Sequence, residues 1–468
     1  QRVGSSARAR LFDGAAQPLA DAKAARAYEF NTEPAGASEI NADLLREHVE
    51  ACIDEVLTHP AAAQISVVAL TTFVGNLMAV DEKYTPLTPV YTYADTRCAD
   101  DVFLLGNRVD KEAVHQRTGC RLHTAYYPAR LHWLKRTQPE LMPALWLDFG
   151  AYLFLRWFGK AACSYSVAAW NGLLNRATLT WDEEWLRLLD VPKESLPALM
   201  DYDVPHVGLT PEYARRWERL RHVPFYLPVG DGAAANVGSG CVDSRHSALT
   251  VGTTAALRTV TEQLPHVPPG LWSYRVNAPL HLLGGATSEG GNIFAWARET
   301  LKLPEDVENA LASCQPDGHG LTVLPLLAGE RSPGWAGNAT GTIHGLRLST
   351  TPLDIVQALL ESVALRLALI AEQLSPPENA VMVASGGALT ASPAWAQMMA
   401  SALNRPIHLT AESELTARGV ALLALRAREG IALDAYPLTI TQVIEPRDAD
   451  VFQAARERQK DLYRRVIG

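Results

Sequence analysis

Apolar residues recur along the chain at two spacings, one typical of helices and one of strands. Residues 44–57 repeat leucine, valine, cysteine and isoleucine at helical spacing after Asn41, which predicts a helix capped by that asparagine. The apolar run 65–70 is typical of a buried strand. Capping residues predict three later helices: 352–374 behind Thr351, 393–403 behind Ser392, and 419–429 ending at Gly430. The alternation of the two element types predicts an α/β protein.

Composition and charge narrow the class of protein. With 468 residues, of which 48% are hydrophobic and 20% charged, the chain suits two or three globular domains and not a disordered or fibrous protein. Its net charge of −9 gives no chain-wide basic surface, so we expect no nucleic-acid partner. The uncharged stretch 60–80 is long enough to span a bilayer. Its polar residues and glycine favour buried strands joined by a loop instead, so we expect no membrane partner.

The cysteines and the N-terminus bear on the compartment. None of the six cysteines forms a C-x-x-C pair, so reduced thiols are expected rather than a zinc site or a disulfide framework. The first 13 residues hold three arginines and no apolar leader. Both observations favour a cytoplasmic protein.

One carboxylate stands at the end of an apolar run within residues 225–240. The run delivers Asp231 into a turn of glycines and alanines, where a substrate can approach the backbone closely. A lone carboxylate in such a turn is suited to accept a proton from a hydroxyl nucleophile. A tight turn in which the aspartate caps the next helix explains the same residues.

Three glycine-containing turns are candidates for phosphate binding. Gly252 and Thr253 separate two strand-like runs and can offer N–H and O–H donors. Gly386 and Gly387 lie between a strand-like run and a predicted helix, which also suits an anion. The third turn, residues 285–292, precedes a helical segment. A hairpin, a strand-to-helix turn and a helix start are the respective structural explanations, and a P-loop is excluded because its lysine is missing.

A fifth segment places an acid and a base two residues apart. Asp95 and Arg97 would face the same side of an extended chain, where they could bind sugar hydroxyls. A surface ion pair that contributes little energy explains the same spacing.

Taken in order, these segments resemble the FGGY family of carbohydrate kinases. The family's signature is similar to Gly341, Ile343 and Gly345 with the following segment that ends in Glu361, and its flanking stretches are similar to 324–333 and 412–423. The resemblance covers residues 3–430. It implies two actin-like (ribonuclease H-like) domains, each a mixed sheet flanked by helices, with an active-site cleft between them. Residues 1–240 would form the sugar-side domain and 241–468 the nucleotide-side domain.

The resemblance also implies roles for residues. Asp231 becomes the general base that takes a proton from a sugar hydroxyl as it attacks the γ-phosphate of ATP, with Mg²⁺ neutralising the phosphates. Gly252, Thr253, Gly386 and Gly387 would lie along the ATP phosphates. No protein ligand of Mg²⁺ is assigned. Dimers are common in the family, so a homodimer is an expectation as well.

The sugar side is assigned less directly. Gly75 and Asn76 occupy the place of the family's sugar contacts, and with Asp95, Arg97 and Asp231 they are the predicted substrate-binding residues. The segments 88–97, 235–240 and 252–258 look most like gluconate-type members. Gluconate is therefore favoured, with a ketopentose (xylulose or ribulose) as the alternative.

The N-terminus departs from the family pattern. The family opens with a strand and an Asp-x-Gly-Thr loop, whereas here that strand is absent and Arg2 or Val3 stands in place of the aspartate. Gly4, Ser5 and Ser6 would remain from the loop and bind the nucleotide. A truncation or a weakened kinase explains the departure. The altered loop leaves open a sugar-binding regulatory homologue. The shared architecture leaves open an actin-like ATPase with no sugar substrate.

Overall fold

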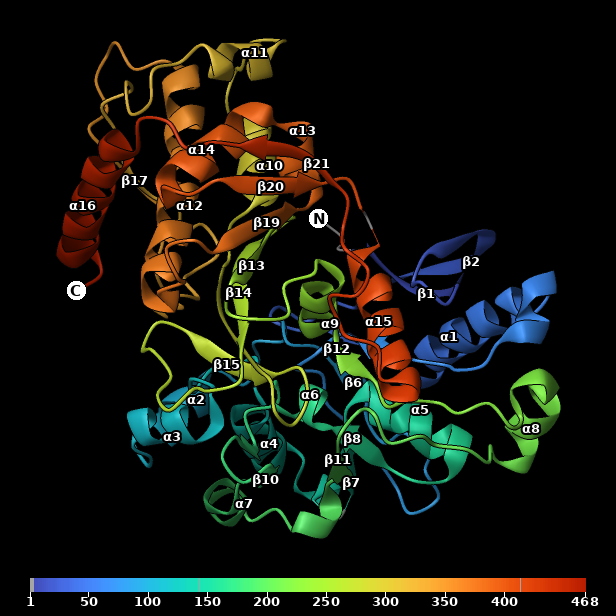
Figure 1. Ribbon diagram of the computed structural model, residues 1–468. Helices are drawn as coiled ribbons and strands as arrows, with labels where there is room; N and C mark the ends of the chain where they lie inside the picture. The colour runs from blue at the N-terminus through green and yellow to red at the C-terminus, as the bar shows by residue number, and fades with distance from the viewer. Residues whose placement is uncertain (1–3, 143, 413) are drawn as a thin grey trace.

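The computed structural model describes residues 4–142, 144–412 and 414–468 and has two bodies of helices and strands, shown in Figure 1. The first body holds the strands β1 (Gly4–Phe12), β2 (Pro18–Glu29), β3 (Glu39–Ile40), β4 (Thr71–Thr72), β5 (Met78–Val80), β6 (Val90–Tyr91), β7 (Leu145–Leu147), β8 (Ala162–Ser164), β9 (Leu174–Asn175), β10 (Thr180–Trp181), β11 (Ala198–Met200) and β12 (Val229–Gly230). Its helices are α1 (Ala42–Val56), α2 (Ala99–Gly106), α3 (Lys111–Thr118), α4 (Tyr127–Thr137), α5 (Phe149–Phe158), α6 (Tyr165–Ala168), α7 (Glu183–Leu189), α8 (Pro211–Arg216) and α9 (Asp231–Gly238).

The rest of the chain forms most of the second body. Its strands are β13 (His246–Val251), β14 (Ala255–Thr261), β15 (Trp272–Arg275), β16 (His281–Thr287), β17 (Thr322–Leu324), β18 (Thr342–His344), β19 (Val381–Ser385), β20 (Ile407–Thr410) and β21 (Ile440–Ile444). Its helices are α10 (Gly291–Thr300), α11 (Val307–Ala312), α12 (Pro352–Leu374), α13 (Gly387–Ala391), α14 (Pro393–Leu403) and α16 (Ala449–Val466). The remaining helix of this half, α15 (Leu415–Glu429), packs on the first body.

A seven-stranded mixed sheet is the centre of the second body, in the order β15-β16-β14-β13-β19-β20-β21. The central strands β13, β19 and β20 are parallel, and the others are antiparallel to their neighbours. Helix α12 is buried along most of its length and packs against α14 and the strands β14 and β16. Buried side chains of the sheet, α12 and α14 form one apolar core.

The first body is built from shorter strand pairs. A long antiparallel hairpin joins β1 and β2, and α1 packs on both strands. The pairs β4–β12 and β8–β11 are parallel, whereas β3–β6 and β5–β7 are antiparallel. Among the described residues, no helix combines the length and the apolarity needed to cross a membrane.

The predicted helices are confirmed together with their caps. The Asn41 side chain accepts the Leu44 N–H at 2.9 Å at the start of α1. Thr351 and Asp354 form a reciprocal capping box at the start of α12, and Ser392 caps α14. The fourth predicted helix, α15, begins four residues earlier than expected and ends at Gly430, whose φ of 71° is left-handed.

The predicted strand over 65–70 is only partly correct. The segment is joined by backbone hydrogen bonds to the chain around Pro224 and Tyr226 through Val68, but strand geometry is reached only at Thr71 and Thr72. Its side chains are half-buried or exposed rather than fully buried. The apolar run therefore predicted the extended backbone correctly, but the prediction that its side chains are buried was wrong.

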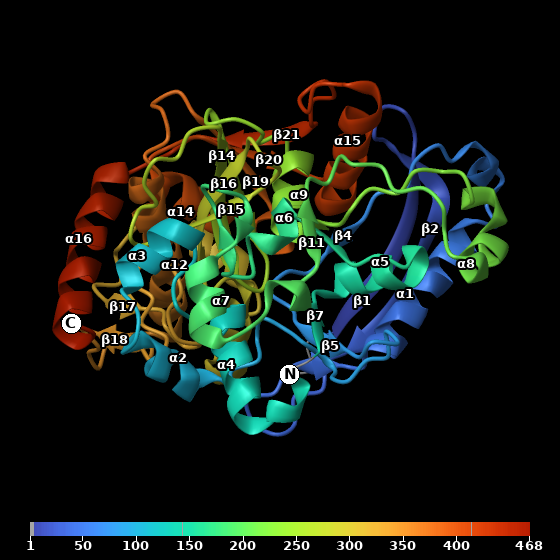
Figure 2. The same cartoon turned by 90° about the horizontal axis from the view of Figure 1, so that it is seen from below.

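Helix α15 lies beside α9 in both views, although most of the second half of the chain is in the other body (Figures 1 and 2). Their backbones touch at two glycines. A Cβ on Gly238 would lie 1.8 Å from the Leu415 carbonyl oxygen, and one on Gly419 would lie 1.8 Å from the Ala234 carbonyl oxygen. Only glycine permits this approach, so the contact fixes α9 against α15.

Replacing Gly419 by alanine is therefore expected to push α15 away from α9. Overpacking of this kind costs about 1–3 kcal/mol or more. We expect Gly419→Ala to lower the urea concentration at the midpoint of unfolding. The matched control is Gly14→Ala, because an added Cβ at Gly14 would meet nothing within 4 Å. Equal midpoints for the two variants would contradict the close contact.

Candidate functional site

Asp231 is the first residue of α9, directly after β12. Gly230, not Asp231, is the N-cap, so the carboxylate is not used to cap the helix. Its Oδ1 accepts the N–H of Gly232 at 2.7 Å. Burial raises the pKa of Asp231 above its ordinary value, while this hydrogen bond and the nearby Arg258 act in the opposite direction. A half-buried carboxylate with a raised pKa is suited to accept a proton.

The indole of Trp170 covers the turn that carries Asp231. A Cβ on Gly230 would lie 2.9 Å from the Trp170 Nε1, and one on Gly232 would lie 3.0 Å from the ring. Trp170 is in turn stacked on Tyr274, with ring centroids 3.6 Å apart, and Tyr274 on Trp272 at 4.2 Å. The two glycines are therefore required by the close packing of this aromatic stack.

Arg258 projects from β14 to the same place. A Cβ on Gly232 would lie 3.6 Å from its Nε. Nε and Nη1 of Arg258 are buried and have no hydrogen-bond partner among the residues that the structure describes. Burial lowers the pKa of Arg258, the charge of Arg331 lowers it further, and Asp231 opposes both. Buried donors without partners are costly, so this guanidinium is arranged for an acceptor that a ligand supplies.

A loop of the second body carries Arg331 and Trp335, and both lie near His123 of the first body. Trp335 packs edge-on against His123, with ring centroids 5.9 Å apart. Burial, together with the charges of Arg331 and Arg130, lowers the pKa of His123 to about 4, so the ring is neutral at pH 7. Its Nδ1 lies 3.1 Å from the Ala125 N–H and accepts it, which leaves the proton on Nε2 as a donor.

The predicted phosphate residues converge at the carboxyl ends of β13 and β19. The carbonyl of Gly252 accepts the Gly291 N–H at 2.6 Å, which joins the turn at 252–253 to the predicted turn at 285–292. A Cβ on Gly386 would lie 2.2 Å from the Val251 carbonyl oxygen, and its φ is 109°. An added Cβ on Gly387 would meet nothing within 4 Å, and Thr253 is exposed. Ligands of α/β sheets bind at such strand ends.

The residues expected to form an N-terminal phosphate loop are in a strand instead. Gly4, Ser5 and Ser6 belong to β1 and pair with Glu29, Tyr28 and Ala27 of β2. The loop prediction for this segment is therefore corrected. The hydroxyl of Ser6 accepts a hydrogen bond from Arg8 at 2.8 Å.

The predicted sugar contact of Asn76 is not supported either. Asn76 is 0% exposed, its Nδ2 donates to the Phe73 carbonyl at 2.5 Å, and its Oδ1 accepts the Phe149 N–H at 2.7 Å. Its side chain holds the turn instead of offering a group to a ligand. Gly75 has a φ of 66° and packs against Tyr93, where a Cβ would lie 3.1 Å from the tyrosine Cβ.

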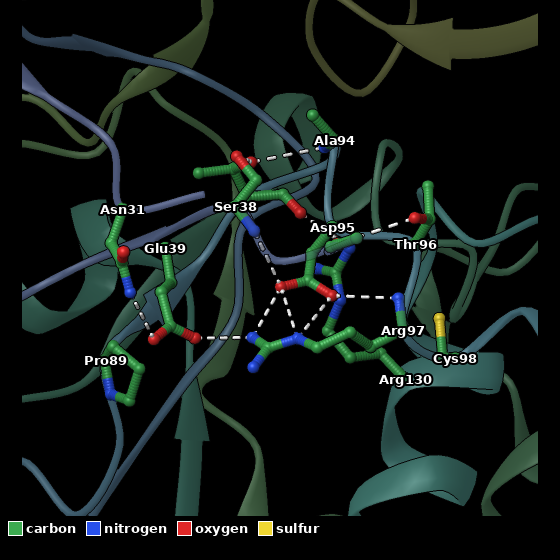
Figure 3. Close-up of polar contacts among 12 residues, drawn as sticks. Asn31, Ser38, Glu39, Pro89, Ala94, Asp95, Thr96, Arg97, Cys98 and Arg130 are labelled. Carbon is green, nitrogen blue, oxygen red and sulfur yellow. Dashed lines mark hydrogen bonds and ion pairs between the residues drawn. The ribbon is translucent and has the colours of Figure 1, made fainter. Parts of the chain in front are cut away.

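Asp95 and Arg97 face each other, as Figure 3 shows. Arg97 donates to both carboxylate oxygens of Asp95 at 3.2 and 3.1 Å through Nε, and to Glu39 at 2.5 Å through Nη2. Asp95, which is 1% exposed, also accepts the Ser38 N–H at 3.0 Å. The pair is thus neither a weak surface ion pair nor free to bind sugar. It secures the segment that carries the half-exposed Tyr93 next to Gly75.

One group of described residues has metal-ligating atoms close together, namely Asp317, His319 and Glu361. The His319 Nδ1 accepts the Leu321 N–H at 2.9 Å, which puts the ring proton on Nε2. That nitrogen donates to Glu361 at 3.1 Å. The proton occupies the position a metal would need, so we do not assign a metal to this group.

The sequence analysis missed Arg258, His123, Arg331 and Trp335 as site residues. Arg258 did carry a signal, because it is the only charged residue of the otherwise apolar or hydroxylic segment Ala255–Thr261. The others stand in segments with no local feature that points to a site. Their position is set by residues more than 100 places away in the chain, which spacing alone does not reveal.

Known proteins are similar to this chain over nearly its whole length. Residues 3–238 match the N-terminal domain, and residues 247–428 the C-terminal domain, of the FGGY family of carbohydrate kinases. A gluconokinase of Bacillus subtilis (strain 168) is 26% identical over 389 residues, covering 79% of this chain and 75% of the relative. A xylulose kinase of Escherichia coli (strain K12) is 27% identical over 404 residues, covering 83% and 82%.

The fold is also similar to that of a solved carbohydrate kinase. The crystal structure of a gluconate kinase from Lactobacillus acidophilus superposes with a TM-score of 0.91 at 26% identity, covering 98% of this chain and 95% of that one. The fold is therefore the two-domain, actin-like α/β fold that the sequence predicted. The chain belongs to the FGGY family of carbohydrate kinases.

Proposed function

We propose that this carbohydrate kinase transfers the γ-phosphate of ATP to a hydroxyl of a sugar acid, with gluconate preferred over a ketopentose. The observation that carries the proposal is the guanidinium of Arg258, which lies next to Asp231. Two of its nitrogens, Nε and Nη1, are buried and have no hydrogen-bond partner among the described residues. A carboxylate satisfies an arginine with two parallel hydrogen bonds. A neutral ketose offers no such anion.

The position of Arg258 favours the sugar over the phosphates as its ligand. It lies four residues beyond Thr254 on β14, and four strand residues span on the order of 13 Å. Its neighbours are Gly232 and the aromatic stack, not the glycine turn at 252–253. The ketopentose alternative rests on the similarity to xylulose kinases, which is as high as that to gluconokinases.

Asp231 is proposed as the general base of the transfer. Its carboxylate would take the proton of the attacking sugar hydroxyl, and the neutral His123 would donate a hydrogen bond to the sugar from Nε2. Small residues at 252–253 and 386–387 would let the ATP phosphates approach the backbone closely. Positioning and charge stabilisation account for most of the acceleration in phosphoryl transfer.

Magnesium ion fits the oxygen donors on the phosphate side. The exposed Thr253 hydroxyl is a hard oxygen donor of the kind Mg²⁺ prefers, and Mg²⁺ usually takes few protein ligands and several waters. When bound, it would neutralise phosphate charge. The regulatory hypothesis, a homologue that binds sugar without catalysis, remains the alternative to turnover.

Replacing Asp231 by asparagine should remove the base and keep the shape of the side chain. We expect sugar-dependent ADP release to fall about 10²–10⁴-fold. Nucleotide affinity, measured by calorimetry, should stay within about twofold. Turnover at the wild-type rate would refute the assignment. If the wild type is also silent while sugar still binds, the regulatory hypothesis is favoured.

The pH dependence of kcat/KM reports the same carboxylate. Since Asp231 must be ionised to act, activity should fall as the pH drops through its pKa, which burial raises above 3.8. The acid limb should therefore lie above that of an ordinary aspartate. Removal of the Arg258 charge should move the limb to still higher pH, because Arg258 lowers the Asp231 pKa. An unmoved limb would mean that another group controls it.

Arg258→Met tests the sugar-acid preference. We expect kcat/KM for gluconate to fall about 10–100-fold, the equivalent of losing a charged hydrogen-bonded pair, with xylulose and ribulose changed only a few-fold. Arg215→Met, at an exposed arginine of α8, is the matched control. Equal losses for all three sugars would overturn recognition of the carboxylate by Arg258.

A further inference from the structure

A cavity lies away from Asp231, between α12 and α16, two helices that run side by side in Figures 1 and 2. Its volume is about 500 Å³, within the range of small-molecule sites. Three cations line it, Arg366 from α12 and Lys460 and Arg464 from α16, against one carboxylate, Glu372. The lining is therefore cationic although the whole chain is acidic.

Arg366 is the buried part of this cavity. Its side chain is 4% exposed, and its Nε has no hydrogen-bond partner among the described residues. The guanidinium lies over the ring of Tyr463, 4.9 Å from the centroid, and is paired with Glu330. Burial lowers the pKa of Arg366 to about 10. An acceptor entering the cavity would satisfy a donor that the protein leaves unpaired.

The other two cations are held only by exposed partners. Lys460 lies 3.3 Å from Glu372 and 2.8 Å from Glu457, and Arg464 pairs with Asp461. These carboxylates are 42–57% exposed, and ion pairs of this kind contribute little. An anion can replace them at small cost.

The same residues hold the loop that reaches the catalytic site. Glu330 accepts the N–H groups of Gly334 at 3.2 Å and Ala336 at 3.3 Å, and the Tyr463 hydroxyl at 2.5 Å. Gly334 also lines the cavity. The loop between these contacts carries Arg331 and Trp335, the two groups that adjoin His123. A ligand drawing on Arg366 would compete with Glu330 and thereby change the anchorage of this loop.

We propose that the cavity between α12 and α16 is a regulatory site for a small phosphate-bearing anion, coupled to the sugar site through the Glu330 anchor. The ligand is either inorganic phosphate or a sugar phosphate, because both present the same oxygens to Arg366, Lys460 and Arg464. The cavity volume exceeds that needed for a bare ion, which favours the sugar phosphate.

The test is calorimetric titration of the whole chain with inorganic phosphate and, separately, with glucose 6-phosphate, a sugar phosphate that is not a product of the proposed reaction. Saturating ADP and Mg²⁺ are present so that the nucleotide site is filled. The variant Lys460→Gln/Arg464→Gln removes one half-buried and one exposed charge. The matched control Lys302→Gln/Arg465→Gln removes two exposed charges that do not line the cavity. We expect the first variant to bind the anion at least tenfold more weakly and the control to stay within twofold.

Coupling is measured as the KM for the sugar with and without the anion. We expect a change of at least twofold in the wild type and the control, and none in Lys460→Gln/Arg464→Gln. The ligand that binds more tightly identifies the source of the phosphate. Absence of binding at millimolar concentrations of either anion, or equal affinity in both variants, would overturn the site. Binding without any change in KM would overturn its regulatory role.

Discussion

Two glycines let the backbones of α9 and α15 pack at a separation that no side chain would permit. At Gly238 and Gly419 an added Cβ would overlap a carbonyl oxygen of the facing helix. The helix that begins with Asp231 is thereby fixed against a helix from the far end of the chain. The carboxylate is consequently positioned by both halves of the sequence. Its geometry relative to Arg258, which comes from the second body, depends on this contact together with the aromatic stack that begins at Trp170.

Burial then determines how the charges around Asp231 behave. Charges interact more strongly in a poorly solvated site, so Arg258 and Asp231 influence each other's pKa, and Arg331 acts on Arg258 as well. A cationic group left without protein partners discriminates more sharply than a satisfied one, because a wrong substrate leaves it unpaired. The same reasoning applies to the unpaired Nε of Arg366, on the other side of the loop that carries Arg331.

The sequence predicted correctly those features that depend on contacts between residues close together in the chain. The caps at Asn41 and Thr351 involve neighbours three residues away, and so the helices were predicted correctly. The roles of Asn76 and Arg97 were not, because their partners Phe149 and Glu39 lie 73 and 58 residues away. Spacing identifies a polar side chain but not whether a distant partner has already used its hydrogen bonds. The family resemblance supplied the fold and the turn at Asp231, which spacing alone left ambiguous.

The hydrogen bond from the Ala125 N–H to His123 determines whether this histidine can donate to a sugar or accept from it. With Nδ1 occupied, His123 offers only a donor, as does Arg258. Asp231 is the acceptor among these groups. Donors thus outnumber acceptors, and a polyol bound here would turn its lone pairs toward the histidine and the arginine. Asp231 would receive the proton of whichever hydroxyl faces it, so in the proposed reaction the single acceptor among these groups marks the oxygen that becomes the nucleophile.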